Sequence, residues 1–132
     1  HQYPIVHKRT PEALGIDPAH TLKVADTVFK KMQEPDFFTA FYHQFGHPDN
    51  LSKPFVRPDV IVLYKKHDQM KLVMLEVENT DKPQGYIDGK MENYRTLATW
   101  PGMFDWWREK ATALRLNICD EASFCFSVEV VK

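Results

Sequence analysis

Three carboxylates on neighbouring segments of the chain are the residues whose types and spacing indicate chemistry. Asp59 precedes one apolar run, and Glu76 and Glu78 close the next apolar run. Carboxylates held close together repel one another and raise one another's pKa values. A divalent cation removes this repulsion, because Mg²⁺ and Mn²⁺ prefer oxygen ligands from two or three carboxylates. The sequence therefore predicts a metal site wherever the fold brings these acids together.

The two apolar runs, residues 60–64 and 72–77, predict a β-hairpin that positions these acids. With a two-residue turn at 68–69, the ladder sets Asp59 opposite Glu78. Side chains repeat with period two along a strand, so all three acids gather on one face at the open end of the hairpin. A slip of one residue in the register would separate them.

A plainer interpretation is that the acids are solvated charges at the points where two strands leave the core. Both faces of the hairpin are apolar, however, with Val60, Val62, Val73 and Leu75 on one face and Ile61, Leu63, Leu72 and Met74 on the other. A hairpin of this kind is covered on both sides, and acids that interrupt a buried run need a partner. The pattern therefore favours the metal site.

Pro58-Asp59 followed by Glu76-Val77-Glu78 resembles the PD-(D/E)xK nuclease superfamily, whose motif is Pro-Asp on one strand and Glu-x-Lys on the next. The resemblance covers residues 58–98. One departure is Glu78, which stands where most members have lysine. Some members supply the lysine from the following helix. Lys90 and Tyr94 form a Lys-x-x-x-Tyr spacing there, similar to the helical motif of phage and recombination-type relatives.

The resemblance implies a role for each motif position. Asp59, Glu76 and the carbonyl of Val77 would hold Mg²⁺ or Mn²⁺, which activates water and polarises the scissile phosphate. Glu78 would orient or deprotonate that water, as the superfamily lysine is thought to do. Lys90 would neutralise charge that builds on the phosphate.

Further polar residues are expected around this centre. The loop and helix after the hairpin predict phosphate contacts for Lys82, Gln84 and Tyr94. In the superfamily the first core helix often lends an acid to the site. Asp26 or Glu34 could fill that role here, although each fits a surface acid as well.

The remaining chain predicts the helices and strands around the hairpin. Helical spacing predicts helices over 18–33, 35–45 and 86–99 and a helical turn over 103–110, whereas alternation predicts strands over 111–119 and 122–131. The first helix opens on Asp17-Pro18, and Leu22, Ala25, Phe29 and Met32 form its predicted inner stripe.

These elements predict one α/β domain over residues 17–132, with a central mixed β-sheet flanked by helices, after an irregular arm at 1–16. The resemblance implies a restriction-endonuclease-like core of a helix, a three-strand meander, a helix and a further strand. Residues 51–56 are the candidate for the first strand of that meander.

Composition narrows the function classes. The 132 residues carry a formal net charge of −1, which argues against a protein that coats nucleic acid by bulk electrostatics. Cys119 and Cys125 lack zinc-type spacing, so reduced thiols and a reducing, cytoplasmic compartment are expected. The sequence has no stretch apolar enough to span a membrane and no signal-peptide pattern, which predicts no membrane association.

The sequence thus predicts a metal-dependent nuclease that hydrolyses phosphodiester bonds, with DNA preferred to RNA as the substrate. The alternative is a catalytically inactive nuclease-fold module that binds nucleic acid or a protein partner within a larger assembly, for example in a phage or defence system. The absent Glu-x-Lys lysine motivates this alternative. A third interpretation is an interaction protein that uses its Trp-rich segment. Many superfamily members act as dimers, so a homodimer stays open.

Overall fold

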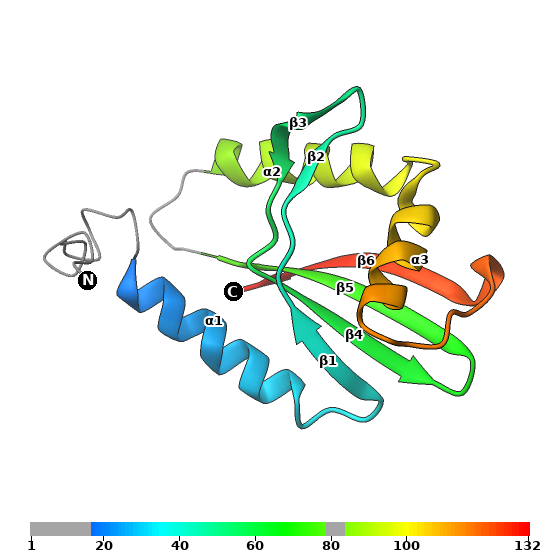
Figure 1. The fold of residues 1–132 in the computed structure, drawn as a ribbon. Coiled ribbons are helices and arrows are strands. Elements are labelled where there is room, and N and C mark those ends of the chain that lie inside the picture. Colours follow the sequence, from blue (N-terminus) through cyan, green and yellow to red (C-terminus); the bar gives the residue numbers. More distant parts are fainter. Residues whose placement is uncertain (1–16, 79–83) are drawn as a thin grey trace, which may run out of the picture.

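The predicted hairpin forms the centre of a four-stranded sheet in the computed structural model (Figure 1). Its strands β4 and β5 pair antiparallel, β1 pairs antiparallel with β4, and β6 runs parallel to β5. The order is β1-β4-β5-β6, a mixed sheet within a single α/β domain, as predicted. The strand bounds are Phe37–Phe41 for β1, Val60–Lys66 for β4, Gln69–Val77 for β5 and Phe124–Val131 for β6.

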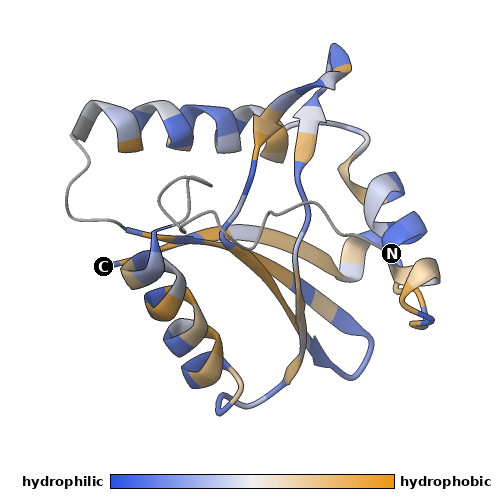
Figure 2. Ribbon diagram, turned by 60° about the vertical axis from the view of Figure 1, so that its left-hand side comes forward, coloured by the Kyte–Doolittle hydropathy of each residue, from blue (hydrophilic) through white to orange (hydrophobic). Residues whose placement is uncertain are grey.

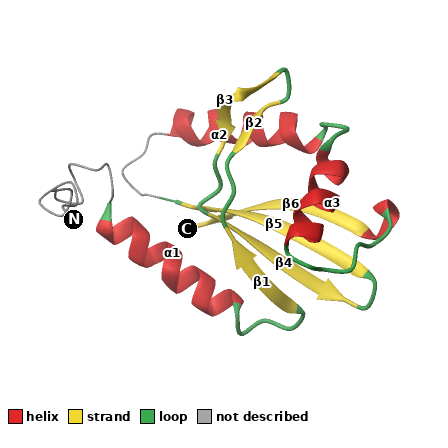
Figure 3. Ribbon diagram, viewed as in Figure 1, coloured by secondary structure: helices red, strands yellow, loops and turns green. Residues whose placement is uncertain are grey.

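The structure describes residues 17–78 and 84–132, so the predicted arm at 1–16 lies outside the described residues. Helices lie on both sides of the sheet (Figure 3). Their bounds are Pro18–Lys31 for α1, Gln84–Ala98 for α2 and Met103–Ala113 for α3. In the described ranges, no helix is long and apolar enough to cross a membrane.

The register of the hairpin differs from the prediction by two residues. Its turn comprises His67 and Asp68, one residue earlier than predicted, and His67 adopts a φ of 53°. Histidine is among the side chains found in this left-handed region more often than most. The shifted ladder brings Asp59 level with Glu76 instead of Glu78. Because side chains alternate with period two, a shift of two leaves the parity of the ladder unchanged, although the Asp59 carboxylate bonds toward α1 and the Glu76 carboxylate toward α2.

Both faces of the hairpin are buried, which confirms the prediction from its two apolar patterns. Toward α2 and α3, Ile61, Leu63, Leu72 and Met74 pack with Leu97 and Trp107. Toward α1, Val60, Val62, Val73 and Leu75 pack with Val24 and Val28. The apolar strands at the middle of the fold are visible in Figure 2. The ends of β4 and β5 are therefore fixed firmly enough to position side chains there.

The start of α1 is as predicted, but its inner face is not. The Asp17 carboxylate accepts hydrogen bonds from the backbone N–H groups of Ala19 and His20, and Pro18 occupies the first turn. The predicted inner stripe is instead exposed, with Leu22 at 71%, Phe29 at 62% and Met32 at 53% exposure. Val24, Thr27 and Val28 face the sheet in its place.

One predicted helix and one predicted strand are wrong. Residues 35–45, expected to be helical, contain strand β1, in which Phe37 and Ala40 pack toward α1 and Phe41 toward the other side. Residues 111–119, expected to be a strand, begin inside α3 because Ala111 continues the buried spacing of Met103 and Trp107. Arg115, at a φ of 59°, follows the end of that helix.

Residues 51–56 do form a strand, but they do not supply the first strand of the meander. They lie in β3 (Asn50–Val56), which pairs with β2 (Phe45–His47) in a separate two-stranded ribbon near α2 (Figure 1). The meander in the sheet is β1, β4 and β5. Strand β6 confirms the strand predicted over 122–131.

His43 predicts a pH-dependent loss of stability on this scaffold. Its half-buried ring lies 4.6 Å from the Phe45 ring and 4.9 Å from the Trp106 ring, centroid to centroid. Burial, with the Lys110 charge added, lowers the pKa of His43 below its ordinary value of 6.5. The unfolded chain therefore binds a proton that the folded chain resists, and stability falls as pH drops through 6.5.

The measurement is the urea midpoint at pH 7.5 and pH 5.5. His43→Gln should show a smaller decrease between these two pH values than the unmodified chain. His67→Asn, which removes a histidine from the exposed hairpin turn, serves as the control and should keep the full decrease. An identical decrease in His43→Gln would show that this ring does not cause the effect.

Candidate functional site

The sheet brings Asp59 and Glu76 together where β4 begins and β5 ends. Asp59 directly precedes β4, and its backbone N–H donates to the Leu75 carbonyl over 2.9 Å. Glu76 and Val77 are the last two residues of β5. Because the ladder places Asp59 level with Glu76, both carboxylates start from adjacent strands at the same end of the sheet.

Glu76 is a buried acid whose two oxygens are both bonded by α2. Its side chain is 9% exposed. The Tyr94 hydroxyl donates to Oε1 over 2.7 Å, and the Lys90 ammonium donates to Oε2 over 3.1 Å. Lys90 and Tyr94 are one helical turn apart, so the Lys-x-x-x-Tyr spacing presents both donors to one carboxylate. A buried carboxylate needs such partners, because burial without them costs several kcal/mol.

Burial and neighbouring charges shift the pKa values of Glu76 and of its two partners. Burial raises the pKa of Glu76 and outweighs the Tyr94 and Lys90 hydrogen bonds, while the negative charge of Asp59 raises it further. Burial also raises the pKa of Tyr94, and the charges of Glu76 and Asp59 add to that rise. Burial opposes the charge of Lys90, but Glu76 and Tyr86 together raise its pKa and keep it an ammonium.

Asp59 is held by the end of β5 and faces α1. Its Oδ2 accepts a hydrogen bond from the Val77 backbone N–H over 2.7 Å. The same oxygen lies 3.5 Å from Nε2 of His20. That His20 nitrogen is also 3.0 Å from the Val77 carbonyl oxygen. Asp59, the Val77 carbonyl and the imidazole of His20 thus meet on the α1 side of the strand ends, whereas the Glu76 carboxylate bonds toward α2.

The first helix does contribute to the site, but through different residues from those predicted. Asp26 pairs with Lys30 over 3.0 Å and its side chain is 61% exposed. Glu34 accepts a hydrogen bond from the Tyr64 hydroxyl, toward the other end of β4. Neither acid joins the cluster. His20 does so instead, and no periodicity in the sequence distinguishes it from a surface histidine.

The structure describes three of the four remaining predicted site residues. Glu78 follows β5 and is half-buried, and its backbone carbonyl accepts a hydrogen bond from the Lys23 ammonium over 3.0 Å. Gln84 is the first residue of α2, and Lys82 lies outside the described residues. Tyr94 is buried, and its hydroxyl is used by Glu76. Its predicted phosphate contact would require that bond to change.

A small hollow of about 30 Å³ borders Glu76 and opens beside basic groups. Arg57, Lys90, Asn93 and Tyr94 line it together with Phe55, Val56 and Glu76. Arg57 is exposed and directly precedes Pro58-Asp59, so its position next to the motif was the available signal. Within residues 17–78 and 84–132, no three His, Cys, Asp or Glu side chains are grouped closely enough to hold a metal ion.

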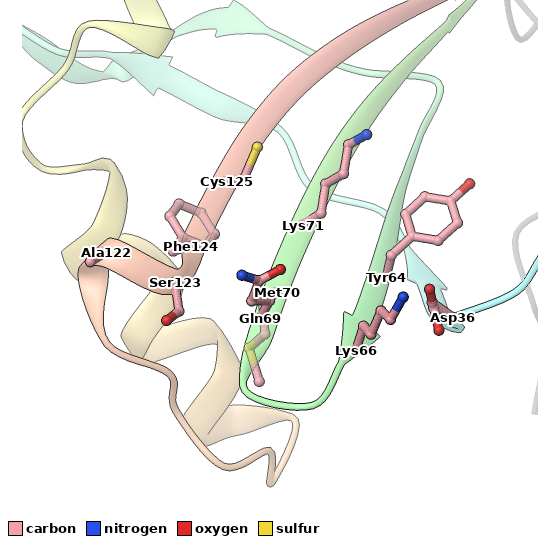
Figure 4. A pocket seen from close by; sticks show the side chains of 10 residues that line it. All are labelled: Asp36, Tyr64, Lys66, Gln69, Met70, Lys71, Ala122, Ser123, Phe124 and Cys125. Atoms are coloured by element: carbon pink, nitrogen blue, oxygen red, sulfur yellow. The ribbon is translucent and has the colours of Figure 1, made fainter.

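Larger hollows lie elsewhere, and one of about 650 Å³ is lined by Glu34, a predicted site residue that lies apart from Asp59 and Glu76. One of about 370 Å³ lies at the hairpin-turn end of the sheet, where Tyr64, Lys66, Lys71 and Cys125 line it (Figure 4). Another of about 620 Å³ lies beside α3 and is lined by Phe45, Trp100 and Trp106 among others. Hollow size does not identify a site for a polymeric substrate, because such a substrate lies along a surface.

Comparison of the chain with protein-family models, with curated proteins and with solved structures gives no match.

Proposed function

We propose that this chain is a metal-dependent nuclease that hydrolyses phosphodiester bonds, with DNA as the preferred substrate. One observation carries the proposal: Asp59 and Glu76 extend from adjacent strand ends and are level with each other in the β4–β5 ladder. Repulsion between the half-buried Asp59 and the buried Glu76 lowers the stability of the fold, and a bound cation would relieve it. A structural role alone would be served by one acid paired with Lys90.

We infer that the bound ion would be Mg²⁺ or Mn²⁺. Asp59 and Glu76 supply carboxylate oxygens and Val77 supplies a carbonyl oxygen, which are the ligand types that both ions prefer. The imidazole of His20, near two of these groups, suits Mn²⁺ in addition. Bound there, the ion would polarise a phosphate oxygen and lower the pKa of a coordinated water.

The residues of the chain itself would orient and neutralise the substrate. Lys90, whose side chain is 35% exposed, reaches solvent beside Glu76 and can place its charge against a phosphate. Arg57 lines the same hollow and offers a second cation. Glu78, two residues beyond Glu76 and just after β5, would accept a proton from the attacking water.

The topology supports the finer fold assignment as well. Apart from the β2-β3 ribbon and α3, the described order is a helix, the meander β1-β4-β5, the helix α2 and the further strand β6, which pairs parallel to β5. The resemblance to the PD-(D/E)xK superfamily implies that order, with the acids at the ends of the second and third meander strands. We therefore propose a restriction-endonuclease-like core.

The test is a cleavage panel of single-stranded, double-stranded and branched DNA and of RNA. Cleavage is expected with Mn²⁺ or Mg²⁺ and none with EDTA or with Ca²⁺ alone, because Ca²⁺ is a poorer activator of water at such sites. Labelled ends distinguish endonuclease from exonuclease products. Failure to cleave any member of the panel with either metal would overturn the proposal.

A second candidate function is an inactive nuclease-fold module, and a specific observation favours it. Both Glu76 oxygens are already bonded by Tyr94 and Lys90, and Oδ2 of Asp59 is bonded by Val77. A chain that keeps these bonds permanently would bind nucleic acid or a protein partner without cleaving. Such a module should bind the panel equally well with EDTA and with Mn²⁺.

A further inference from the structure

An aromatic hollow that the proposed mechanism does not use lies between the β2-β3 ribbon and α3. Its volume is about 620 Å³, and its wall contains Phe45 of β2, Trp106 of α3, and Trp100, which lies between α2 and α3. His43, in the segment between β1 and β2, also lines it. The ribbon and α3 lie on the same side of the sheet as α2 (Figure 1). The chemistry of the lining, rather than the size, indicates what the hollow binds.

The Trp106 indole is held in place by two neighbouring rings. Its centroid lies 4.7 Å from that of Phe45 and 4.9 Å from that of His43. Aromatic pairs at such distances stabilise one another beyond the area that they bury. Trp100 and Trp106 are nevertheless both half-buried, so part of each indole stays accessible. The hollow therefore offers fixed, accessible aromatic surface to a flat ring.

Two glycines give the hollow its shape. A Cβ atom at Gly102 would lie 2.5 Å from the nearest atom of the Trp100 ring, so this indole can lie against the backbone only because residue 102 has no side chain. A Cβ atom at Gly46 would overlap the backbone of Leu51, so glycine also allows β2 and β3 to approach closely. Gly46 and Gly102 both line the hollow. The positions of its two walls thus depend on these close approaches.

The charges at the hollow disfavour an anion and favour a hydrogen-bond donor. Asp105 and Glu109 supply two carboxylates, against the one guanidinium of Arg108, which lies 3.7 Å from Asp105. Burial lowers the pKa of His43, so its imidazole adds no positive charge at neutral pH. A phosphate group is repelled by this excess of acids, whereas an N–H group finds acceptors in the carboxylates. The lining therefore suits a flat, uncharged ring with N–H groups on its edge.

We propose that the hollow binds an unpaired base of a single-stranded DNA substrate and prefers bases that carry an amino group, such as adenine and cytosine, to thymine. The base stacks on the accessible indole surface of Trp100 or Trp106. Its amino group donates to Asp105 or Glu109, in the way that carboxylates accept from cytosine N4. Thymine has no amino group, and two carbonyl oxygens flank its one ring N–H. The choice of occupant rests on the proposed function, because a nuclease fold is what brings a nucleic acid to this surface.

Strand β3 connects the hollow to the candidate site. Leu51, near the start of β3, lines the hollow, and Arg57, just beyond its end, lines the small hollow beside Glu76. Six residues of extended strand span about 20 Å. Lys53 and Arg57 are exposed along this path and can neutralise backbone phosphates. A single strand with one base in the hollow can therefore extend along β3 to Asp59 and Glu76.

Base preference is measured by fluorescence anisotropy with labelled 12-mers of oligo-dA, oligo-dC and oligo-dT. EDTA is present throughout, so that neither metal binding nor cleavage contributes. Oligo-dA and oligo-dC should bind at least about fivefold more tightly than oligo-dT, within the discrimination that one good base contact gives. Asp105→Asn combined with Glu109→Gln should reduce this difference, because amides offer donors to thymine as well. Equal affinity of the unmodified chain for the three oligonucleotides would overturn the proposal.

Three variants test the aromatic wall. Trp106→Leu should weaken binding of oligo-dA at least about tenfold through loss of base stacking, whereas Trp106→Phe keeps a ring and should bind within about threefold of the unmodified chain. Gly102→Ala removes no aromatic side chain but displaces the Trp100 ring, and it should weaken binding about fivefold. Phe29→Leu is the matched control, because Phe29 is 62% exposed on α1, and it should bind normally.

Failure of this inference and failure of the proposed function give different results. If Trp106→Leu and Phe29→Leu bind oligo-dA equally, or if no 12-mer binds, the base site is wrong even where cleavage with Mn²⁺ is observed. If the base preference and its loss in Trp106→Leu are observed but no nucleic acid is cleaved, the base site stands and the nuclease proposal fails. Binding is compared only among variants that urea midpoints show to be folded, and Gly102→Ala provides the test if Trp106→Leu does not fold.

Discussion

Replacing Asp59 with asparagine is expected to lower metal-dependent cleavage by about 10³-fold, since loss of a ligand charge removes several kcal/mol of stabilisation from the transition state. Asparagine keeps the size of the side chain, and its carbonyl oxygen can still accept the hydrogen bond from Val77. The fold should therefore survive, as judged by circular dichroism and by the urea midpoint.

The control for this substitution is Asp26→Asn, which makes the same change of charge on the exposed side of α1. Its cleavage rate should lie within about twofold of that of the unmodified chain, because Asp26 is exposed and its charge is screened by salt. Initial rates are compared at one Mn²⁺ concentration for all three proteins. If Asp59→Asn retained the rate of Asp26→Asn, Asp59 could not be a metal ligand.

The Glu76–Lys90 pair gives the largest expected effect on stability. Lys90→Met removes the ammonium bonded to Oε2 and leaves a buried carboxylate whose pKa is already raised by burial. We expect a loss of about 2 kcal/mol at pH 7, below the range for fully buried pairs because Lys90 is partly exposed. Lys30→Met, which breaks the solvent-exposed pair with Asp26, should cost less than about 0.5 kcal/mol.

The pH dependence of this loss has a defined sign. The pKa of Glu76 is raised above its ordinary value of 4.5, so the folded chain binds more protons than the unfolded chain above that pH. Stability is therefore lost as pH rises through 4.5 to the folded pKa, and Lys90→Met extends that window upward. Urea midpoints at pH 4 and pH 7 should show a smaller defect at pH 4. A defect that is equal at both pH values would contradict this account.

Much of the sheet could be predicted because the residue pattern of its two central strands indicates that both of their faces are buried. The runs 60–64 and 72–77 are apolar on both faces, and only a strand covered on both sides explains such a pattern. The pairing register could not be predicted as well. It depends on whether His67 accepts a positive φ, and the residue types in the turn allow more than one answer.

The first helix shows why its orientation was predicted wrongly. Periodicity assigns the most apolar stripe to the core, yet His20, Lys23 and Lys31 face the sheet and its neighbours. These side chains donate to strand-end carbonyls and to Glu129, an arrangement that depends on tertiary contacts and leaves no local signal. The same reason explains why His20 was missed as a site residue and why Leu22 and Phe29 are left outside.

The acids of the candidate site and their partners on α2 could be predicted from the sequence, but the hydrogen bonds between them could not. Asp59, Glu76 and Lys90 stood out because a short motif and a helical spacing carry them. The two hydrogen bonds from α2 to Glu76 depend on how that helix packs across the sheet. Sequence spacing shows that Lys90 and Tyr94 share a face but not which carboxylate they meet.

Mn²⁺ binding, followed by isothermal titration and by the loss of the free-ion paramagnetic resonance signal, tests the central claim most directly. The unmodified chain should bind one Mn²⁺ at this centre, and Asp59→Asn and Glu76→Gln should each weaken binding by about tenfold or more. Asp26→Asn should bind like the unmodified chain. Absence of Mn²⁺ binding, or binding that neither substitution at the strand ends changes, would contradict the assignment of Asp59 and Glu76 as a metal centre.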